Sequence, residues 1–416
     1  MENTISTLRR WLWGLILAFV ILVPSFREVD YKSYAVSLGF LLLLLLEGLR
    51  LFKRPELSFS PLELYLVLYV GWTCLSYFWS PVDLAASEYL GRFLPCVGLF
   101  LLVRQESPEQ IASLRPLLWL GGVLCAMAFG FLQGLHLDWL PSYFQTPNGR
   151  IFSIFGNPNV YAAFLILSFP VLLLNLPRLK KPFSSPVILG IFTLLFLTSL
   201  RLTGSRAGFA ALAVEILVLL FMAWPWIAKI KYGKWVILLL SIIVLGFFAE
   251  MATAFAFRPT ERLEIWKGAF QMILAKPLQG WGVGQFSLNF QPYMTGELSA
   301  QALKDNTFAE HVHNEVLEMG VELGLVGLLV AGFFWLRLMG RAIGKCLKSR
   351  REGEALSAEI LGLTVGLLGL GMTNLFDYNC RLSGISFFLW MSAGLLANRA
   401  FPTDKIKFKL QVGALL

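Results

Sequence analysis

The chain of 416 residues is 57% hydrophobic and carries a formal net charge of +9. This content excludes an ordinary soluble domain, because repeated apolar runs of about 17–25 residues are long enough to cross a bilayer. The runs do not alternate between apolar and polar residues, as membrane-spanning strands do. The positive charge is typical of basic cytoplasmic loops, so we expect no nucleic acid as a partner. The five cysteines are scattered and form no C-x-x-C pair, which predicts neither a disulfide framework nor a metal site.

We therefore predict an all-α, polytopic integral membrane protein with about 12 transmembrane helices and one large periplasmic loop containing amphipathic helices. The predicted spans are residues 8–26, 34–51, 61–79, 88–103, 113–135, 159–176, 186–202, 207–224, 235–251, 315–337, 356–377 and 382–399. Residues 1–251 then hold the first nine spans, residues 252–314 the loop, and residues 315–416 the last three spans and a cytoplasmic tail.

Most lysines and arginines fall in connections on the side of the N-terminus. Arg9 and Arg10 precede the first apolar run, which has no convincing cleavage site and is expected to stay as an uncleaved span. Basic residues favour the cytoplasmic side, so both termini are predicted to be cytoplasmic and the large loop periplasmic.

The large loop contains a predicted amphipathic helix that begins after Thr260 and ends before Pro277. Its apolar stripe consists of Leu263, Trp266, Phe270, Ile273 and Leu274. A stripe with Trp and Phe is typical of helices that lie on a membrane surface. The glycine-rich stretch that follows, Gly280 to Gly284, is interpreted as a flexible turn, because no strand precedes it as a dinucleotide loop would require.

Two histidines stand where the loop meets the tenth predicted span. His313 is a candidate general base, because an imidazole titrates close to neutral pH. A structural histidine bound to a neighbouring loop is the alternative. His311 and His313 without a clear third ligand make a weak metal site.

Three glutamates follow at helical spacing. Glu315, Glu318 and Glu322 form one stripe, and His313 points away from it if all four lie on one regular helix. If Asn314 caps the helix, His313 lies outside it. The role of the stripe and of His311 stays open, although Glu322, about two turns into a span, is expected to have a partner.

The same helix carries Gly320 and Gly324. Small residues four positions apart predict close packing against another helix.

Several cations are expected on the outer side. Arg206 follows Ser205, which can cap the eighth span, and this helix start suits a phosphate group. The alternative is an arginine that extends to lipid headgroups. Arg262 lies four residues before Trp266, so a stacked pair or a plain surface arginine is expected.

A further polar stretch, Arg150 to Asn159, leads into the sixth span. Its Asn157-Pro158-Asn159 turn is a helix-entry device, and a single copy does not predict a pore.

Taken in order, these motifs resemble the O-antigen ligase superfamily of membrane glycan ligases and polymerases. The resemblance rests on Arg150 with Asn157-Pro158-Asn159, Thr203-Gly204-Ser205-Arg206-Ala207-Gly208, Glu261-Arg262 with Trp266, Gly280-x-Gly282-x-Gly284-x-Phe286, and His313-Asn314 with Leu317, Glu322 and Gly324. One departure is Ser153, where many relatives have glycine.

The resemblance implies transfer of a glycan from a polyprenyl (undecaprenyl) pyrophosphate to a hydroxyl acceptor, with inversion. The reaction takes place at the periplasmic face of the bacterial inner membrane, without cofactor or metal. His313 would be the base, and Arg206 and Arg262 would hold the pyrophosphate. The substrate-binding residues would be Arg150, Asn159, Asn314, Trp266 and Glu322.

The expected partners are a lipid-linked oligosaccharide or polysaccharide donor, a lipid A–core or glycan acceptor, and membrane lipids. A ligase is favoured over a polymerase or a protein O-oligosaccharyltransferase of the same superfamily. The sequence leaves open the acceptor, the sugar specificity and the oligomeric state, for which a monomer is the default. In a different class, a lipid or glycan transporter would depend instead on Glu47, Glu215 and Glu250 in or near spans.

Overall fold

The computed structural model describes residues 2–23, 31–53, 56–106, 115–135, 141, 144–146, 149–178, 182, 184–229, 232, 235, 242, 261–296, 298–300, 308–354, 357–401 and 406–409. The helices are α1 (Glu2–Leu22), α2 (Tyr31–Lys53), α3 (Pro61–Leu75), α4 (Asp83–Gln105), α6 (Arg115–Gly134), α7 (Pro158–Asn175), α8 (Pro186–Thr203), α9 (Arg206–Ile227), α11 (Glu261–Ala275), α12 (Phe286–Asn289), α14 (Glu315–Glu352), α15 (Ala358–Asn374) and α16 (Ser383–Ala400). Short 3₁₀ helices are η1 (Ser76–Trp79), η3 (Ser153–Phe155), η4 (Leu176–Arg178), η5 (Gln291–Tyr293) and η6 (Asn379–Arg381).

Helices dominate the described part of the chain, and the prediction of a helical, multi-pass membrane protein is confirmed at this level. Eleven of the predicted spans coincide with helices, and residues 235–251 lie almost wholly outside the described residues. Among those residues, seven helices are long and apolar enough to cross a membrane, and two more are apolar but shorter. The count of about 12 and the periplasmic placement of the loop remain predictions.

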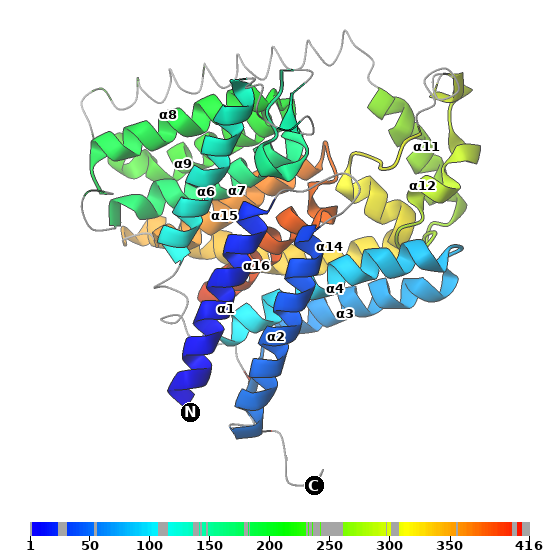
Figure 1. Cartoon of the computed structure of the whole chain (residues 1–416), viewed down its shortest axis with the longest axis horizontal. Helices are drawn as coiled ribbons and strands as arrows, with labels where there is room; N and C mark the ends of the chain where they lie inside the picture. The colour runs from blue at the N-terminus through cyan, green and yellow to red at the C-terminus, as the bar shows by residue number, and fades with distance from the viewer. Residues whose placement is uncertain are drawn as a thin grey trace.

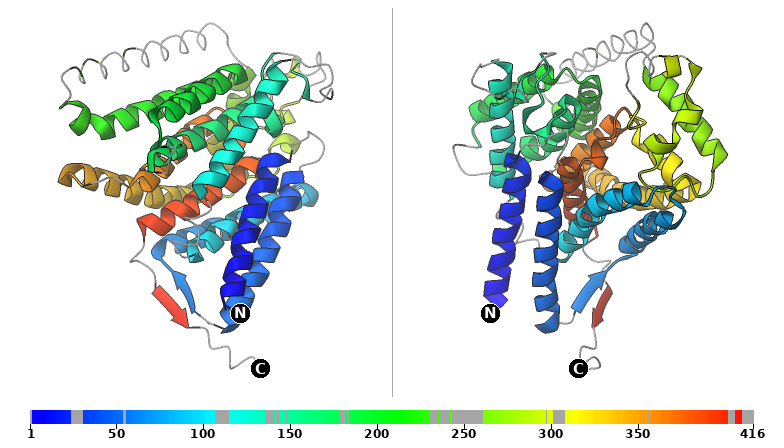
Figure 2. Two further views of the ribbon diagram at one scale, coloured as in Figure 1. Left: turned by 60° about the vertical axis from the view of Figure 1, so that its left-hand side comes forward. Right: turned by 45° about the vertical axis from the view of Figure 1, so that its right-hand side comes forward.

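One small pair of strands was not predicted. The strand β1 (Glu56–Phe59) pairs antiparallel with β2 (Ile406–Lys409), with Glu56 opposite Lys409. The pair joins the segment before α3 to the segment after α16, and it lies at the same end of the molecule as the start of α1 (Figure 2). The helices α11 and α12 lie at the other end (Figure 1).

The core is a helical bundle in which α15 packs on α7, α16 on α4, and α14 on α3. Gly366 shows why α15 and α7 approach so closely. A Cβ at this position would lie 2.5 Å from the carbonyl oxygen of Leu167. A larger residue would push the two helices apart, and the dispersion contacts of a close-packed interface would be lost.

Two basic residues used to predict the orientation are buried in ion pairs instead of lying in open loops. Arg9 contacts Glu106 at 2.6 Å, and fully buried Arg104 contacts Glu63 at 2.8 Å. Glu63 also accepts a hydrogen bond from the backbone N–H of Ser60, in the capping box that begins α3. These arginines therefore join helices within the bundle.

The long helix α14 is broken at Gly324, where the backbone has φ 64° and ψ −168°. The loop that follows α11 supplies hydrogen-bond partners for backbone groups that the break leaves without helical partners. The N–H of Gly282 donates to the carbonyl of Glu322 at 2.8 Å, and the N–H of Leu325 donates to the carbonyl of Pro277 at 2.8 Å. The predicted helix packing at Gly324 is therefore wrong, because a Cβ there would lie 2.3 Å from the carbonyl oxygen of Leu278.

The glycine-rich turn is thus built into the break in α14. Gly280 and Gly284 have positive φ, and a Cβ on Gly280 would lie 2.4 Å from the carbonyl oxygen of Glu322. The interpretation as a flexible turn is wrong, because close backbone approach holds this segment against α14.

The helix α11 begins and ends where predicted, but its buried face differs from the predicted stripe. Ile265, Gly268, Ala269 and Met272 are buried at helical spacing, and the apolar members of this face pack into a small core with Phe286, Phe290, Val312 and Val321. Within the predicted stripe, Leu263, Phe270 and Leu274 are exposed, whereas Trp266 and Ile273 pack partly against that core. Part of the predicted membrane-facing stripe is therefore exposed, and its contact with lipid remains a prediction.

Candidate active site

His313 lies immediately before α14 in a constrained backbone. The side chain of Asn314 accepts a hydrogen bond from the N–H of Leu317 at 3.0 Å and caps the helix. This is the alternative in which Asn314 is the cap. His313 is consequently outside the helix, with φ 55°. A left-handed backbone at a residue other than glycine is costly and occurs often at functional sites.

Asp377, which sequence analysis did not select, is the centre of the site. It lies after α15, and its side chain is only 4% exposed. Its Oδ1 is 3.1 Å from Nδ1 of His313, and its Oδ2 accepts a hydrogen bond from Nδ2 of Asn159 at 2.7 Å. Its Oδ2 also faces Arg262, with 3.8 Å to a guanidinium nitrogen. One carboxylate thus joins three of the predicted residues.

The electrostatic surroundings keep Asp377 ionised. Burial opposes its negative charge, but the hydrogen bond with His313, the charge of Arg262 and the N–H of Tyr378 outweigh burial. The pKa of Asp377 therefore lies below its ordinary value of 3.8. An ionised Asp377 favours a proton on Nδ1 of His313, which leaves Nε2 free to accept a proton.

Arg150 extends the same network. Its Nε donates to the carbonyl of Thr203 at 2.7 Å, and its guanidinium donates to Oδ1 of Asn159 at 2.9 Å. Gly204 permits this approach, because a Cβ there would lie 3.1 Å from Nε of Arg150. The pKa of Arg150 is lowered, first by burial and then by the positive charges of Arg262 and Arg206.

Three guanidinium groups therefore lie near one another, and one of them, that of Arg262, faces Asp377. We call Arg150, Arg206, Arg262, His313 and Asp377 the arginine site. Arg206 is exposed at the start of α9, where Ser205 caps the helix by accepting from the N–H of Gly208 at 3.3 Å. Within the described residues Arg206 has no ion-pair partner, so the arginine site carries an excess of positive charge that suits an anion.

Trp266 and Asn314 hold the backbone on both sides of His313. The indole N–H of Trp266 donates to the carbonyl of Val312 at 3.0 Å, and Nδ2 of Asn314 donates to the carbonyl of Leu375 at 3.0 Å. Arg262 donates to the carbonyl of Phe376 and is partly buried, so it is not the plain surface arginine of one alternative, and the described residues show no stack on Trp266, the other alternative. These contacts tie α11, the start of α14 and the segment after α15 together.

The backbone at Ser153 has a conformation that suits glycine, and contacts with α6 stabilise it. It has φ 51°, in the region that glycine adopts at no cost. Its N–H donates to Oε1 of Gln133 at 2.6 Å, its carbonyl accepts from Nε2 of Gln133 at 2.9 Å, and its hydroxyl donates to the carbonyl of Ala126 at 2.6 Å. The neighbouring helix α6 therefore supports a conformation that serine alone would disfavour.

A second charged group lies beyond Tyr378. We call Glu315, Glu318, Glu322 and Arg381 the glutamate cluster. Arg381 contacts the three carboxylates at 3.3, 3.2 and 2.7 Å respectively. Burial opposes the charge of Arg381, but the three carboxylates outweigh it, and its pKa is raised. Glu322 thus has the partner that was expected, and it belongs to this cluster and not to the arginine site.

His311 connects the two groups. Its Nδ1 lies 2.7 Å from Oε1 of Glu318, and its ring stacks on Tyr378 with centroids 3.8 Å apart. The ring of His313 meets Tyr378 edge-on, with centroids 5.2 Å apart. Across the described residues, no group of three or more His, Cys, Asp or Glu side chains is arranged to hold a metal.

Residues 191–332 match the family model described as O-antigen ligase. This stretch, about a third of the chain, is similar to the O-antigen ligase family. The match covers Arg206, Arg262, His313 and Glu322, and its family supports a transferase at a coarse level. The comparison with curated proteins found no match.

Three important residues were missed by sequence analysis: Asp377, Tyr378 and Arg381. All three follow α15, in the polar run Asp377-Tyr378-Asn379-Cys380-Arg381 between two apolar helices. A polar run of this kind on the predicted outer side could have indicated that these residues belong to the site. The prediction of a span to residue 377 concealed it, because Asp377 was placed at a helix end.

Proposed function

We propose that this protein moves a glycan from a polyprenyl (undecaprenyl) pyrophosphate carrier to a hydroxyl acceptor, with lipid A–core as the expected acceptor. The reaction would take place at the periplasmic face of a bacterial inner membrane, with both termini cytoplasmic. The observation that carries the proposal is the arginine site itself, where Arg262 faces the His313–Asp377 pair and the charges of Arg262 and Arg206 act on Arg150. Pyrophosphate needs several cations, and guanidinium groups bind its oxygens in pairs.

The reaction follows from the roles of these groups. Nε2 of His313 takes the proton of the acceptor hydroxyl, and the hydroxyl oxygen forms a bond to the anomeric carbon of the glycan. The bond between that carbon and the pyrophosphate oxygen breaks, and its electron pair leaves with the carrier pyrophosphate. Arg206 and Arg262 stabilise the negative charge that develops there. No electron donor, nucleotide or metal is required.

The other predicted residues position these groups. Arg150 donates to Asn159, Asn159 donates to Asp377, and Asp377 orients His313. Trp266 and Asn314 fix the backbone beside His313. We assign Glu322 to the glutamate cluster, away from the pyrophosphate.

The transport alternative has one supporting feature. Glu215 is fully buried in α9, and neither of its carboxylate oxygens has a hydrogen-bond partner among the described residues. Glu47 is instead paired with Arg9 and Arg50, and Glu250 lies outside the described residues. A deletion strain separates the classes, because loss of a flippase accumulates lipid-linked glycan on the inner face and loss of a transferase accumulates it on the outer face.

The decisive experiment replaces the proposed base. His313→Asn keeps a residue that tolerates a left-handed backbone and removes the imidazole. With purified protein and lipid-linked donor, we expect transfer to fall by at least about 100-fold, the usual lower range for loss of a general base. Membrane insertion and thermal stability of the variant serve as controls. Transfer at the wild-type rate in a well-folded variant would contradict the proposal.

The acceptor is identified in the same deletion strain. Free lipid A–core beside normal polymer on its carrier supports a ligase. Single repeat units on lipid A–core point to a polymerase, and unmodified pilin points to a protein O-oligosaccharyltransferase.

A further inference from the structure

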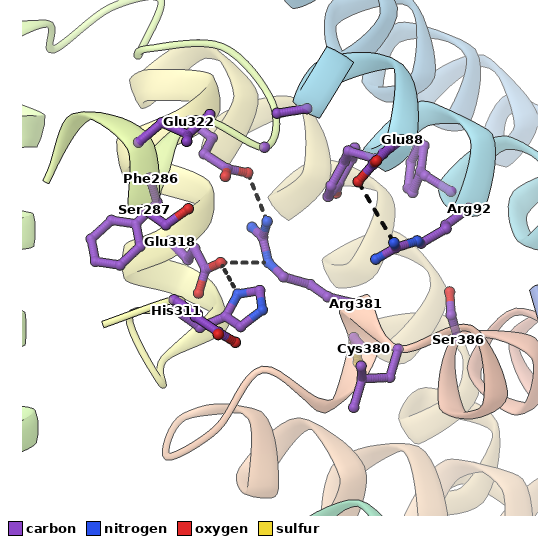
Figure 3. A pocket seen from close by; sticks show the side chains of 17 residues that line it. Glu88, Arg92, Phe286, Ser287, His311, Glu318, Glu322, Cys380, Arg381 and Ser386 are labelled. Carbon is purple, nitrogen blue, oxygen red and sulfur yellow. Dashed lines mark hydrogen bonds and ion pairs between the residues drawn. The ribbon is translucent and has the colours of Figure 1, made fainter. Parts of the chain in front are cut away.

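A cavity of about 250 Å³ lies on the glutamate side of Tyr378. Its walls come from α4, α12, the first turns of α14 and the segment from Cys380 to Ser386. Figure 3 shows Arg381, Glu318, Glu322 and His311 on one side of it and Glu88 with Arg92 on the other. The volume is below the roughly 300–1,000 Å³ of pockets for drug-sized ligands, so it suits one small ring.

The position of the cavity relates it to the proposed base. His311 lines the cavity and stacks on Tyr378, and His313 meets the same ring of Tyr378 edge-on. The cavity is therefore separated from His313 by the stacked pair of His311 and Tyr378. A ligand centred in the cavity therefore lies beside the proposed base and not on it.

The charges of the walls exclude a phosphate as the occupant. Arg381 is already engaged by Glu318 and Glu322, and Arg92 at the rim faces Glu88 at 3.8 Å. The exposed Glu310 adds another carboxylate. With four glutamates and two arginines, these walls carry more negative than positive charge, unlike the arginine site.

The same walls offer what a saccharide needs. Carboxylates and a guanidinium accept and donate hydrogen bonds to hydroxyl groups. The rings of Tyr89, Phe93 and Phe286 supply apolar faces against which a sugar ring can pack. Glu318 and Glu322 are 1% and 2% exposed, so their positions are fixed before a ligand arrives.

We infer that this cavity binds a sugar of the acceptor next to the one that carries the attacking hydroxyl, and that the bound sugar is uncharged or bears an amino group. The inference rests on the proposed function. The donor's pyrophosphate belongs at the arginine site, and an inverting displacement brings the acceptor oxygen to the carbon from the side opposite the leaving group. The cavity lies across His311 and Tyr378 from the arginines, on the side left for the acceptor.

The test fills the cavity without touching the arginine site. Ser287 lines the cavity and is exposed, so Ser287→Trp places a large ring there. The matched control is Ser87→Trp, since Ser87 is also exposed but does not line the cavity, and its hydroxyl bonds only within α4. Both variants are assayed for transfer, with purified lipid A–core and purified undecaprenyl-pyrophosphate-linked glycan varied separately.

We expect Ser287→Trp to raise the KM for lipid A–core at least about tenfold, which corresponds to about 1.4 kcal/mol. The KM for the donor should stay within about twofold in the same variant, and Ser87→Trp should change neither value. A second variant, Glu88→Gln, should raise the acceptor KM by about two- to tenfold through a lost charged hydrogen bond.

An unchanged acceptor KM in Ser287→Trp overturns the inference, and so does a rise confined to the donor KM, which would assign the cavity to the donor glycan. These failures differ from failure of the proposed function. If His313→Asn is inactive and Ser287→Trp behaves as the wild type, only the assignment of the cavity is wrong. If His313→Asn transfers normally, the proposed function is wrong.

Discussion

The arginine site and the glutamate cluster lie on opposite sides of Tyr378 and differ in how their charges are balanced. In the glutamate cluster, Arg381 contacts three carboxylates, and its side chain is only 7% exposed. In the arginine site, Arg262 faces Asp377, the charges of Arg262 and Arg206 act on Arg150, and Arg206 is exposed. A buried cation that contacts several carboxylates holds elements together, whereas a cation excess open to solvent attracts an anion. The comparison predicts that substitutions in the two groups change different properties.

The largest effect on catalysis is expected for Asp377→Asn. The amide keeps the shape of the side chain but no longer favours the proton on Nδ1 of His313, so we expect kcat to fall by about 10²–10⁴-fold. A rate measured in saturating donor and acceptor tests this. Because the pKa of Asp377 lies below 3.8, its contribution to stability is fully present above that pH and is lost only as pH falls through the lower folded value. If the wild-type activity falls between about pH 7 and pH 5, protonation of Asp377 is therefore not the cause. An Asn variant with the wild-type kcat would contradict its positioning role.

The largest effect on stability is expected for Arg381→Met. Removing the cation leaves three largely buried carboxylates near one another. Loss of one partner of a buried ion pair lowers the free energy of unfolding by about 3–5 kcal/mol. A lower thermal midpoint of the purified protein in detergent, with reduced yield, would show this. Arg381→Lys retains the charge and serves as the control, with a smaller loss. A Met variant as stable as the wild type would show that the cluster does not stabilise the fold.

A more moderate effect is expected for Arg206→Lys. The positive charge remains but the paired donors of the guanidinium are lost, so the donor KM should rise about 10-fold while stability is unchanged. Arg201→Lys is the matched control, because Arg201 is an exposed arginine at the end of α8. Inorganic pyrophosphate should inhibit the wild type in competition with the donor and inhibit Arg206→Lys less. Equal inhibition of both proteins would remove Arg206 from the proposed anion site.

The smallest effect is expected for Ser153→Gly. Glycine adopts the positive φ at this position without strain, but it loses the hydroxyl bond to Ala126 and gains chain entropy when unfolded. These terms oppose one another, so we expect a change in unfolding free energy within about 1 kcal/mol and an unchanged rate of transfer. Ser153→Val is the contrasting variant, because a β-branched residue is strongly disfavoured at this backbone angle. If Val is tolerated as well as Gly, the backbone there does not require a left-handed residue.

The pattern of the chain was sufficient for most helices and for every residue of the arginine site except Asp377. Apolar runs predicted helices because burial in a bilayer depends on local composition, and Asn314 and Ser205 were recognised as caps because capping is also local. Asp377 was missed because it is 64 residues from His313 and no local spacing relates them. The buried face of α11 was missed for a similar reason, since two apolar stripes compete and only the packing partner selects one.

The sequence by itself determined a helical membrane protein with a histidine and several arginines gathered on the predicted outer side. It did so because hydrophobicity, capping and charge are properties of neighbouring residues. Only the tertiary structure decided which carboxylate contacts His313, which arginine contacts the three glutamates, and where α14 breaks. Those outcomes depend on segments after α15 and before α12 that fold back beside α14, and their contacts are set by packing between distant parts of the chain.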